Sequence, residues 1–315
     1  MKLAFVFPGQ GAQETNMMSD MVASYPVVRD RIAEMSDFTQ TDLHSLYKSA
    51  DEQTLHDGRL SGLIVAVSSV ALLELVKQEI GIEGAAFAGY SVGQYTALYA
   101  AGALTLKEML HVLEQRQVFL DAAAKAKPSR MVGVIGVPQD KVEDILSHYG
   151  GAIISNYNCP NHFSISCRAE DAGNIAQDFD RAEAIKSIVL PVAGGWHSPF
   201  VADAAEELKG VLSDLTIKTP QGLFIDNVTA QPVKDIEIIR DNLYDHVKSP
   251  VYWQQSVRYM LEQGFEDFVE IGYGDQLSKF IKFTNRRAAI YRTGNVDNFV
   301  MTQQQLGPQL METAK

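Results

Sequence analysis

A serine between two glycines is the first feature of this 315-residue chain that could do chemistry. It lies in the Gly-Tyr-Ser-Val-Gly segment at 89–93, after a short apolar run and before an apolar helical pattern. Glycine on both sides permits the tight strand-to-helix turn of a nucleophile elbow, which exposes the serine hydroxyl. The pattern therefore predicts that Ser91 is a nucleophile.

A serine nucleophile needs a base, and histidine is the side chain whose pKa suits that role near neutral pH. Of seven histidines, His197 follows a predicted strand, at the mouth of a loop, where sheet enzymes place catalytic groups. We expect His197 to be the base. His162 lies at the turn where a predicted strand begins. The others lie among polar residues and are expected to be solvated: His44, His56, His111, His148 and His246.

An acyl-transfer serine also needs donors for the developing oxyanion. The backbone N–H of Val92 is predicted to lie at a helix N-terminus. The Gly9-Gln10-Gly11 turn can supply a second donor, because glycine lets the backbone approach a ligand closely. An ordinary tight turn is the alternative for this segment. It lacks the third glycine of a dinucleotide fingerprint and the Gly-Lys pair of a P-loop, so phosphate binding is disfavoured.

Arg116 lies on the apolar stripe of a predicted helix, three residues after Leu113 and three before Phe119. A guanidinium on a core-facing stripe must find an anion. One candidate is a carboxylate of the protein, in a buried ion pair. The other is the carboxylate of a substrate, held by the guanidinium fork. The pattern alone leaves both open.

These residues need a sheet to position them. Apolar runs at 3–7, 85–89 and 268–272 predict buried parallel strands. Helices are predicted at 60–80, 92–102 and 105–125, the last opened by a capping box of Thr105 and Glu108. This alternation favours an α/β fold with a hydrolase-like, mostly parallel sheet and flanking helices.

The middle of the chain has a different order of elements. From about residue 129 it reads strand, helix, strand, strand, helix, strand, which is the ferredoxin-like pattern. The predicted ranges are 131–137, 139–149, 152–157, 162–167, 170–182 and 185–192. We therefore predict a large α/β domain formed by 1–127 and 194–315, interrupted by a ferredoxin-like α+β subdomain at 128–193.

Composition excludes some partners. The net charge of −12 opposes nonspecific binding to nucleic acid or to an anionic membrane. Cys159 and Cys167 are too few for a disulfide framework and lack the spacing of a zinc site, so we expect packing residues and no metal. The N-terminal apolar run is too short for a signal peptide, and no later segment approaches eighteen uninterrupted apolar residues, the length of a membrane span. We expect a cytoplasmic protein.

Five segments resemble, in order, the malonyl-CoA:acyl carrier protein transacylases and the acyltransferases of polyketide synthesis, including trans-acting ones. They are the Phe-Pro-Gly-Gln-Gly-Ala-Gln segment at 7–13, the elbow at 89–93, Arg116 with Phe119 and Leu120, Asn-Tyr-Asn-Cys-Pro at 156–160, and Trp-His-Ser-Pro-Phe at 196–200. The resemblance runs nearly end to end. It implies an acyltransferase that binds no cofactor, uses malonyl-CoA as substrate, has an acyl carrier protein as partner, and acts as a monomer.

The resemblance also implies a ping-pong mechanism. Ser91, deprotonated by His197, attacks the thioester, and the oxyanion lies between the backbone N–H groups of Gln10 and Val92. Arg116 pairs with the free carboxylate of malonate. A backbone carbonyl orients the histidine in this family, and we place the matching position at Tyr252, within segment 249–253.

One departure from the family pattern and one match to it concern the acyl pocket. Tyr90 replaces the usual histidine beside the nucleophile, and Trp196 is a bulky aromatic before the base, which resembles the malonyl-selective pattern. Two other functions stay open: a proofreading hydrolase that releases acyl groups from carrier proteins, and a noncatalytic carrier-binding subunit. Basic residues that could dock an acidic carrier are Lys186, Lys279, Lys282, Arg286 and Arg287.

Overall fold

Two sheets organise the computed structural model, which describes residues 2–11, 13–55 and 58–313. The larger sheet has the strand order β7-β2-β1-β8-β9, and every neighbouring pair is parallel. Its strands are β1 (Leu3–Phe7), β2 (Ala86–Gly89), β7 (Leu223–Ile225), β8 (Asp267–Glu270) and β9 (Ala289–Arg292). In register, Phe7 of β1 faces Gly89 of β2, so the Gln10 turn and the serine elbow leave the sheet at the same edge.

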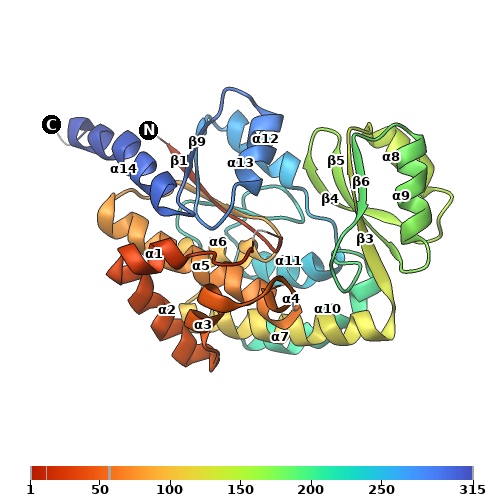
Figure 1. Ribbon diagram of the computed structural model, residues 1–315, viewed down its shortest axis with the longest axis horizontal. Coiled ribbons are helices and arrows are strands. Elements are labelled where there is room, and N and C mark those ends of the chain that lie inside the picture. The colour runs from red at the N-terminus through yellow and green to blue at the C-terminus, as the bar shows by residue number, and fades with distance from the viewer. Residues whose placement is uncertain (1, 12, 56–57, 314–315) are drawn as a thin grey trace.

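Helices cover both faces of the larger sheet (Figure 1). One core cluster joins Phe5 and Phe7 to the long helices α5 (Gly58–Glu79) and α7 (Leu106–Ala126). A second joins Ala4, Val6 and Ala88 on the opposite face to α12 (Trp253–Glu262) and α13 (Gln276–Thr284). The helices outside the smaller sheet are α1 (Ser19–Ser24), α2 (Pro26–Thr39), α3 (Leu43–Ser49), α4 (Glu52–Leu55), α5 (Gly58–Glu79), α6 (Gly93–Ala100), α7 (Leu106–Ala126), α10 (Ala202–Asp214), α11 (Ile236–Lys248), α12 (Trp253–Glu262), α13 (Gln276–Thr284) and α14 (Val296–Thr313), with a 3-10 turn at Pro199–Val201.

Two of these helices bear on predictions made from the sequence. The Thr105 side chain accepts from the Glu108 backbone and the Glu108 side chain accepts from the Thr105 backbone, so the predicted capping box of α7 is confirmed. The Leu60–Glu79 stretch of α5 is long and apolar enough to cross a membrane, with a mean hydropathy of 1.9. Because 78% of it is buried inside the protein, it serves here as a core helix.

The smaller sheet is antiparallel, with the order β4-β5-β3-β6. Numbered from its own first strand this order is 2-3-1-4, which is the arrangement of a ferredoxin-like fold. Helices α8 (Gln139–Leu146) and α9 (Ala172–Arg181) form the two crossovers. The elements are β3 (Ser129–Ile135), α8 (Gln139–Leu146), β4 (Ile153–Cys159), β5 (His162–Arg168), α9 (Ala172–Arg181) and β6 (Lys186–Val189). They have their own apolar core and form a separate lobe beside the larger sheet (Figure 1). The predicted fold class is confirmed, whereas the boundaries at 127/128 and 193/194 stay a prediction.

Candidate active site

The serine elbow depends on its two glycines for space. A Cβ added at Gly89 would lie 2.0 Å from the carbonyl carbon of Gly93, and one added at Gly93 would lie 2.3 Å from the carbonyl oxygen of Phe7. Ser91 itself has a φ of 52°, in the left-handed region that non-glycine residues seldom adopt. Strain of this kind persists only where the surroundings impose it, and it commonly marks functional positions.

His197 lies within hydrogen-bonding distance of Ser91. The Ser91 Oγ is 2.7 Å from Nε2 of His197, and Nδ1 of the same ring is 2.8 Å from the backbone carbonyl oxygen of His246. A carbonyl oxygen can only accept, so Nδ1 carries the proton of a neutral ring. Nε2 then has its lone pair directed at the serine hydroxyl. The two residues predicted to be nucleophile and base are therefore brought together in an arrangement that can pass a proton.

The orienting carbonyl was predicted at Tyr252, and that prediction is wrong. The Tyr252 N–H donates to the carbonyl of Asn227, and its ring stacks on Tyr157 at 5.0 Å. The carbonyl that holds His197 belongs to His246, in the last turn of α11. An α-helical carbonyl normally accepts from the residue four positions later, which here is Pro250 and has no N–H. Proline thus leaves the His246 carbonyl available for the His197 ring.

The His246 side chain was expected to be solvated and is instead fully buried. Its ring lies 4.9 Å from that of His197 and 6.0 Å from that of Tyr95. Neither ring nitrogen has a hydrogen-bond partner among the described residues. Burial, with added repulsion from His197 and Arg116, holds the pKa of His246 well below its usual value. The buried stripe of α11, which includes Ile239, Leu243 and Val247, is the sequence signal that could have found it.

Electrostatics keep His197 neutral as well. Its side chain is 2% exposed, and burial is the main cause that lowers the pKa of His197 to about 3. The positive charge of Arg116 acts in the same direction, while the hydrogen bond to the His246 carbonyl opposes both. A neutral imidazole is the form that can accept a proton from serine.

Arg116 is buried in α7, with 4% of its surface exposed. Its guanidinium carbon lies 5.8 Å from the centre of the Tyr95 ring, and its Nε has no partner. No ion pair joins it to a carboxylate within residues 2–11, 13–55 and 58–313. Burial lowers the pKa of Arg116 and the Tyr95 hydroxyl counteracts this. The buried ion pair that the sequence left open is therefore not formed by the described residues.

The two candidate oxyanion donors have unoccupied N–H groups. Neither the Gln10 nor the Val92 backbone N–H donates to another residue in the described part of the chain. Gly9 permits the close approach of the first turn, because a Cβ there would lie 2.5 Å from the Tyr90 carbonyl oxygen. The Gln10 turn is thereby held against the elbow. Buried N–H groups are normally paired, so an unoccupied pair beside a nucleophile suits a ligand oxygen.

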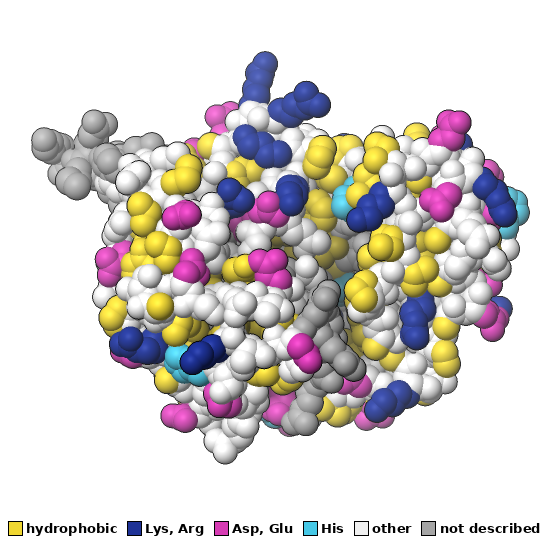
Figure 2. Space-filling view, in the orientation of Figure 1, with side chains coloured by type: hydrophobic (Ala, Val, Ile, Leu, Met, Phe, Trp, Pro, Cys, Tyr) yellow, Lys and Arg dark blue, Asp and Glu magenta, His cyan; other side chains and the backbone are white. Residues whose placement is uncertain are grey.

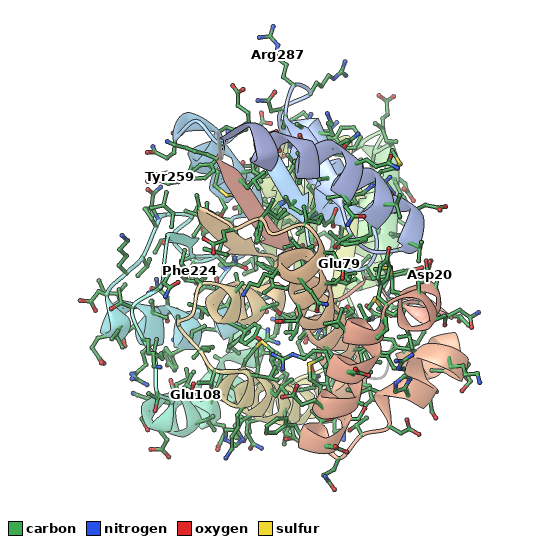
Figure 3. The ribbon with its side chains drawn as sticks, turned by 90° about the vertical axis from the view of Figure 1, so that its left-hand side faces the viewer. Asp20, Glu79, Glu108, Phe224, Tyr259 and Arg287 are labelled. Carbon is green, nitrogen blue, oxygen red and sulfur yellow. The ribbon has the colours of Figure 1, made fainter. Side chains whose placement is uncertain are left out.

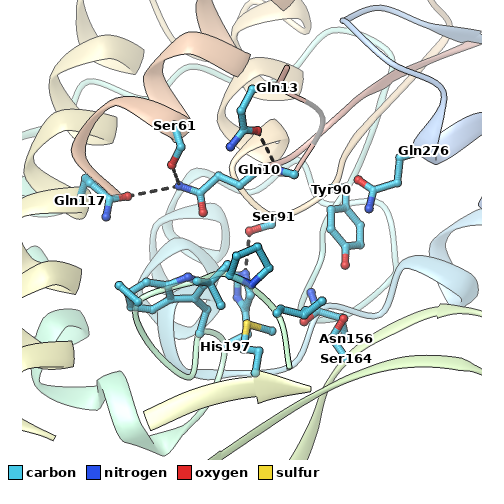
Figure 4. Close-up of a pocket in the computed structure, with 17 residues that line it drawn as sticks. Gln10, Gln13, Ser61, Tyr90, Ser91, Gln117, Asn156, Ser164, His197 and Gln276 are labelled. Carbon is cyan, nitrogen blue, oxygen red and sulfur yellow. Dashed lines mark hydrogen bonds between the residues drawn. The ribbon is translucent and has the colours of Figure 1, made fainter. Parts of the chain in front are cut away.

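A cavity of about 310 Å³ opens over Ser91 and His197 (Figure 4). Tyr90 and Trp196 line it, as the acyl-pocket prediction requires, together with Gln10 and Gln117. The Tyr90 hydroxyl donates to Oδ1 of Asn158 at 2.6 Å, which fixes the ring in the wall. Arg116 lines a neighbouring cavity of about 30 Å³, which shares Gln117 with the larger one. In the described part of the chain, no group of three or more His, Cys, Asp or Glu residues is placed to hold a metal ion.

Sequence reasoning missed Asn227, which follows β7 and is fully buried. Its Oδ1 accepts from the Ser91 N–H at 2.9 Å, and its Nδ2 donates to the Gly89 carbonyl at 2.6 Å. Its own N–H donates to Oε1 of Gln94 in α6. One amide side chain thus clamps both sides of the strained elbow.

With this geometry in hand, comparison with known proteins is decisive. The acyl transferase domain family matches residues 4–299. The chain belongs to this acyltransferase family. A malonyl CoA-acyl carrier protein transacylase of Bacillus subtilis (strain 168) is 32% identical over 290 residues, which is 91% of this chain and 91% of that protein. The resemblance found from the sequence motifs is thereby confirmed, and the protein is an acyltransferase.

Solved structures agree with the family. The malonyl CoA-acyl carrier protein transacylase of Coxiella burnetii matches with a TM-score of 0.93 at 25% identity, over 98% of each chain. A malonyl-transacylase solved in complex with a type II polyketide synthase acyl-carrier protein matches with a TM-score of 0.92 at 26% identity, over 97% of this chain and all of that one. The acyltransferase fold is thus shared across nearly the whole chain.

Proposed function

We propose that this acyltransferase moves a malonyl group from malonyl-CoA to the phosphopantetheine thiol of an acyl carrier protein, in fatty-acid or polyketide synthesis, through an acyl-serine intermediate. The observation that carries the proposal is the Ser91–His197 pair, 2.7 Å apart, together with a buried Arg116 whose charge acts on His197 and which has no carboxylate partner among the described residues. The names of the relatives add the donor and the carrier protein as substrates.

In the first half-reaction, Nε2 of His197 takes the hydroxyl proton as the Ser91 Oγ attacks the thioester carbonyl carbon. The negative charge that develops on the carbonyl oxygen is stabilised by the backbone N–H groups of Gln10 and Val92. The carbon–sulfur bond then breaks, and the thiolate of coenzyme A leaves with the proton from Nε2. A malonyl ester remains on Ser91.

The second half-reaction reverses the roles. The carrier thiol gives its proton to Nε2 and its sulfur attacks the ester carbonyl, so a new carbon–sulfur bond forms and the Ser91 oxygen leaves with the proton. Loss of the hydrogen bond between Ser91 and His197 would stop both halves, because one base serves them both.

In the proposed function, Arg116 makes the site selective for a dicarboxylic acyl group. A buried guanidinium without a carboxylate partner favours an incoming anion, and the free carboxylate of malonate is such an anion. A proofreading hydrolase for neutral acyl chains has no use for this charge. Trp196 occupies space beside the base that an α-methyl group needs, which favours malonyl over methylmalonyl by about 1–3 kcal/mol.

The carrier protein needs positive surface on a chain of net charge −12. Lys and Arg side chains gather on the upper edge in Figure 2, and Arg287 projects from the body of the protein in Figure 3. Phe283 of α13 is 69% exposed among them. Lys279 pairs with Asp275, and Lys282 donates to two backbone carbonyls, which leaves Arg286 and Arg287 as the stronger docking candidates. A monomeric state and a cytoplasmic location complete the proposal.

Steady-state kinetics with malonyl-CoA and a carrier protein test this function. A covalent intermediate predicts parallel double-reciprocal lines when the carrier concentration is varied at several fixed malonyl-CoA concentrations. Release of free malonate as the main product would support the hydrolase instead. Absence of both transfer and hydrolysis would support the noncatalytic carrier-binding subunit.

A further inference from the structure

A chain of side-chain hydrogen bonds runs along the cavity wall, and Figure 4 shows the part of it formed by Gln10, Ser61 and Gln117. Nε2 of Gln10 donates to Oγ of Ser61 at 2.9 Å and to Oε1 of Gln117 at 3.4 Å. Nε2 of Gln117 in turn donates to a carboxylate oxygen of Asp121 at 2.8 Å. Gln117 and Asp121 are one turn apart on α7, and Gln117 is buried.

The donors and acceptors in this chain of hydrogen bonds have a fixed order. A carboxylate only accepts hydrogen bonds, so Asp121 draws the amino end of the Gln117 amide toward itself. The carbonyl end of Gln117 must then face Gln10, and it accepts a hydrogen bond from the amino end of the Gln10 amide. Asp121 thereby sets which way the Gln10 amide points, although the two side chains are linked only through Gln117.

The consequence is an acceptor atom in the cavity wall. Oε1 of Gln10 points toward the interior of the cavity in Figure 4, on the side where Ser91 lies. No residue in the described ranges donates a hydrogen bond to it. A ligand group that satisfies this oxygen has to be an N–H or O–H donor. The malonate carboxylate is an acceptor and would be repelled, so the complementary group belongs to the thiol side of the substrate.

We propose that Oε1 of Gln10 accepts a hydrogen bond from the amide N–H nearest the sulfur in the pantetheine arm, which is common to coenzyme A and the carrier protein. Gln117 and Asp121 are positioning residues that keep the acceptor end of Gln10 turned to the cavity. This inference rests on the proposed transferase function. The two ends of the substrate are then bound by different residues. Arg116 binds the acyl carboxylate, and Gln10 binds the amide of the pantetheine arm.

A pair of small malonyl thioesters isolates this contact. Malonyl-N-acetylcysteamine carries the amide at the same distance from sulfur as pantetheine does, and an S-alkyl malonyl thioester of equal chain length replaces the amide by methylenes. The ratio of their kcat/KM values for acylation of Ser91 reports the hydrogen bond, because the acyl group and the chemistry are the same. The wild-type protein is expected to prefer the amide by about five-fold, as for one neutral hydrogen bond.

Three variants test the direction of the chain. Gln117→Leu is expected to reduce the ratio to about one, because the Gln10 amide can then rotate. Asp121→Asn is expected to give an intermediate ratio, because an asparagine amide can present either end. Gln115→Leu makes the same change on the same helix, outside the residues that line the cavity, and should keep the wild-type ratio.

The outcomes separate this inference from the function on which it rests. Equal use of the two thioesters by the wild-type protein, or an unchanged ratio in Gln117→Leu, overturns the role of Gln10 while malonyl transfer still stands. Failure of the wild-type protein to be acylated by malonyl-CoA or by either thioester overturns the transferase function itself. Because the readout is a ratio within each variant, a partly unfolded preparation does not imitate the expected result.

Discussion

Nδ1 of His197 lies 2.8 Å from the backbone carbonyl oxygen of His246, in the last turn of α11. The arrangement performs with a backbone group what other serine enzymes do with an aspartate, since it fixes the tautomer and the orientation of the base. The carbonyl carries no negative charge. It therefore stabilises the protonated His197 ring less than a carboxylate would. The pH behaviour of the enzyme should reflect this.

Acylation should tolerate acid unusually well. Because burial lowers the pKa of His197 to about 3, the ring stays neutral far below its ordinary value of 6.5. The kcat/KM for malonyl-CoA should therefore stay level from about pH 8 to about pH 5, without the acid-side decrease centred near pH 6.5 that an ordinary histidine base gives. Arg116→Met removes a nearby positive charge, so the pKa of His197 should rise and the acid-side decrease should move to higher pH. A wild-type decrease centred near 6.5 would contradict this account.

His246 should make the protein sensitive to acid in its stability. The pKa of its ring is well below 6.5 in the folded protein and ordinary in the unfolded chain, so only the unfolded chain gains this proton as the pH falls below 6.5. This contribution to the free energy of unfolding is complete above 6.5 and decreases below it. His246→Gln should reduce that pH dependence by about 1.4 kcal/mol per pH unit, measured by urea unfolding. His148→Gln, at an exposed position, is the matched control. Equal slopes in the two variants would contradict the prediction.

Arg116 should set acyl selectivity. Arg116→Met should lower the kcat/KM for malonyl-CoA by about 100-fold, as for a lost charge-assisted pair, and should change that for acetyl-CoA much less. Arg116→Lys should recover part of the malonyl activity, because it keeps the charge without the fork. The comparison uses single-turnover acylation, with the surface variant Arg181→Met as control. Equal losses for the two acyl groups would make Arg116 a structural residue.

Asn227 should couple stability to acylation. Asn227→Ala removes the acceptor of the Ser91 N–H, in a partly buried hydrogen bond, and the donor to the Gly89 carbonyl, in a buried one. The free energy of unfolding should fall by about 2–4 kcal/mol, and acylation should slow at temperatures where the protein is still folded. Asn174→Ala on the surface of α9 is the matched control. Full acylation by a folded Asn227→Ala protein would show that the elbow holds its geometry unaided.

Much of the fold could be predicted from short-range patterns in the sequence. The glycines at 89 and 93, the capping box at Thr105 and the βαββαβ order depend on short-range sterics and hydrogen bonding, and the sequence predicted them. The orienting carbonyl could not be read in the same way, because it depends on which backbone group lacks a helical partner. Pro250 frees the carbonyl four residues before it, whereas the prediction chose a residue after it.

Side-chain contacts between segments far apart in the sequence were harder to predict. Asn227 meets the elbow from a residue 136 positions away, and a single asparagine after a short strand gives no local sign of that contact. His246 did leave a sign in the apolar period of α11, which its polar neighbours Asp245 and Lys248 obscured. His56 lies outside the described residues, so its predicted solvation stays a prediction.

The central claim is that Ser91 carries the malonyl group between the two thiols. Mass spectrometry of the intact protein after brief incubation with malonyl-CoA, followed by peptide mapping, tests it directly. We predict the added mass of one malonyl group on Ser91, its loss when a carrier protein is supplied, and no adduct on Ser91→Ala. Malonyl transfer to the carrier by Ser91→Ala, or an adduct mapped to another residue, would contradict the account.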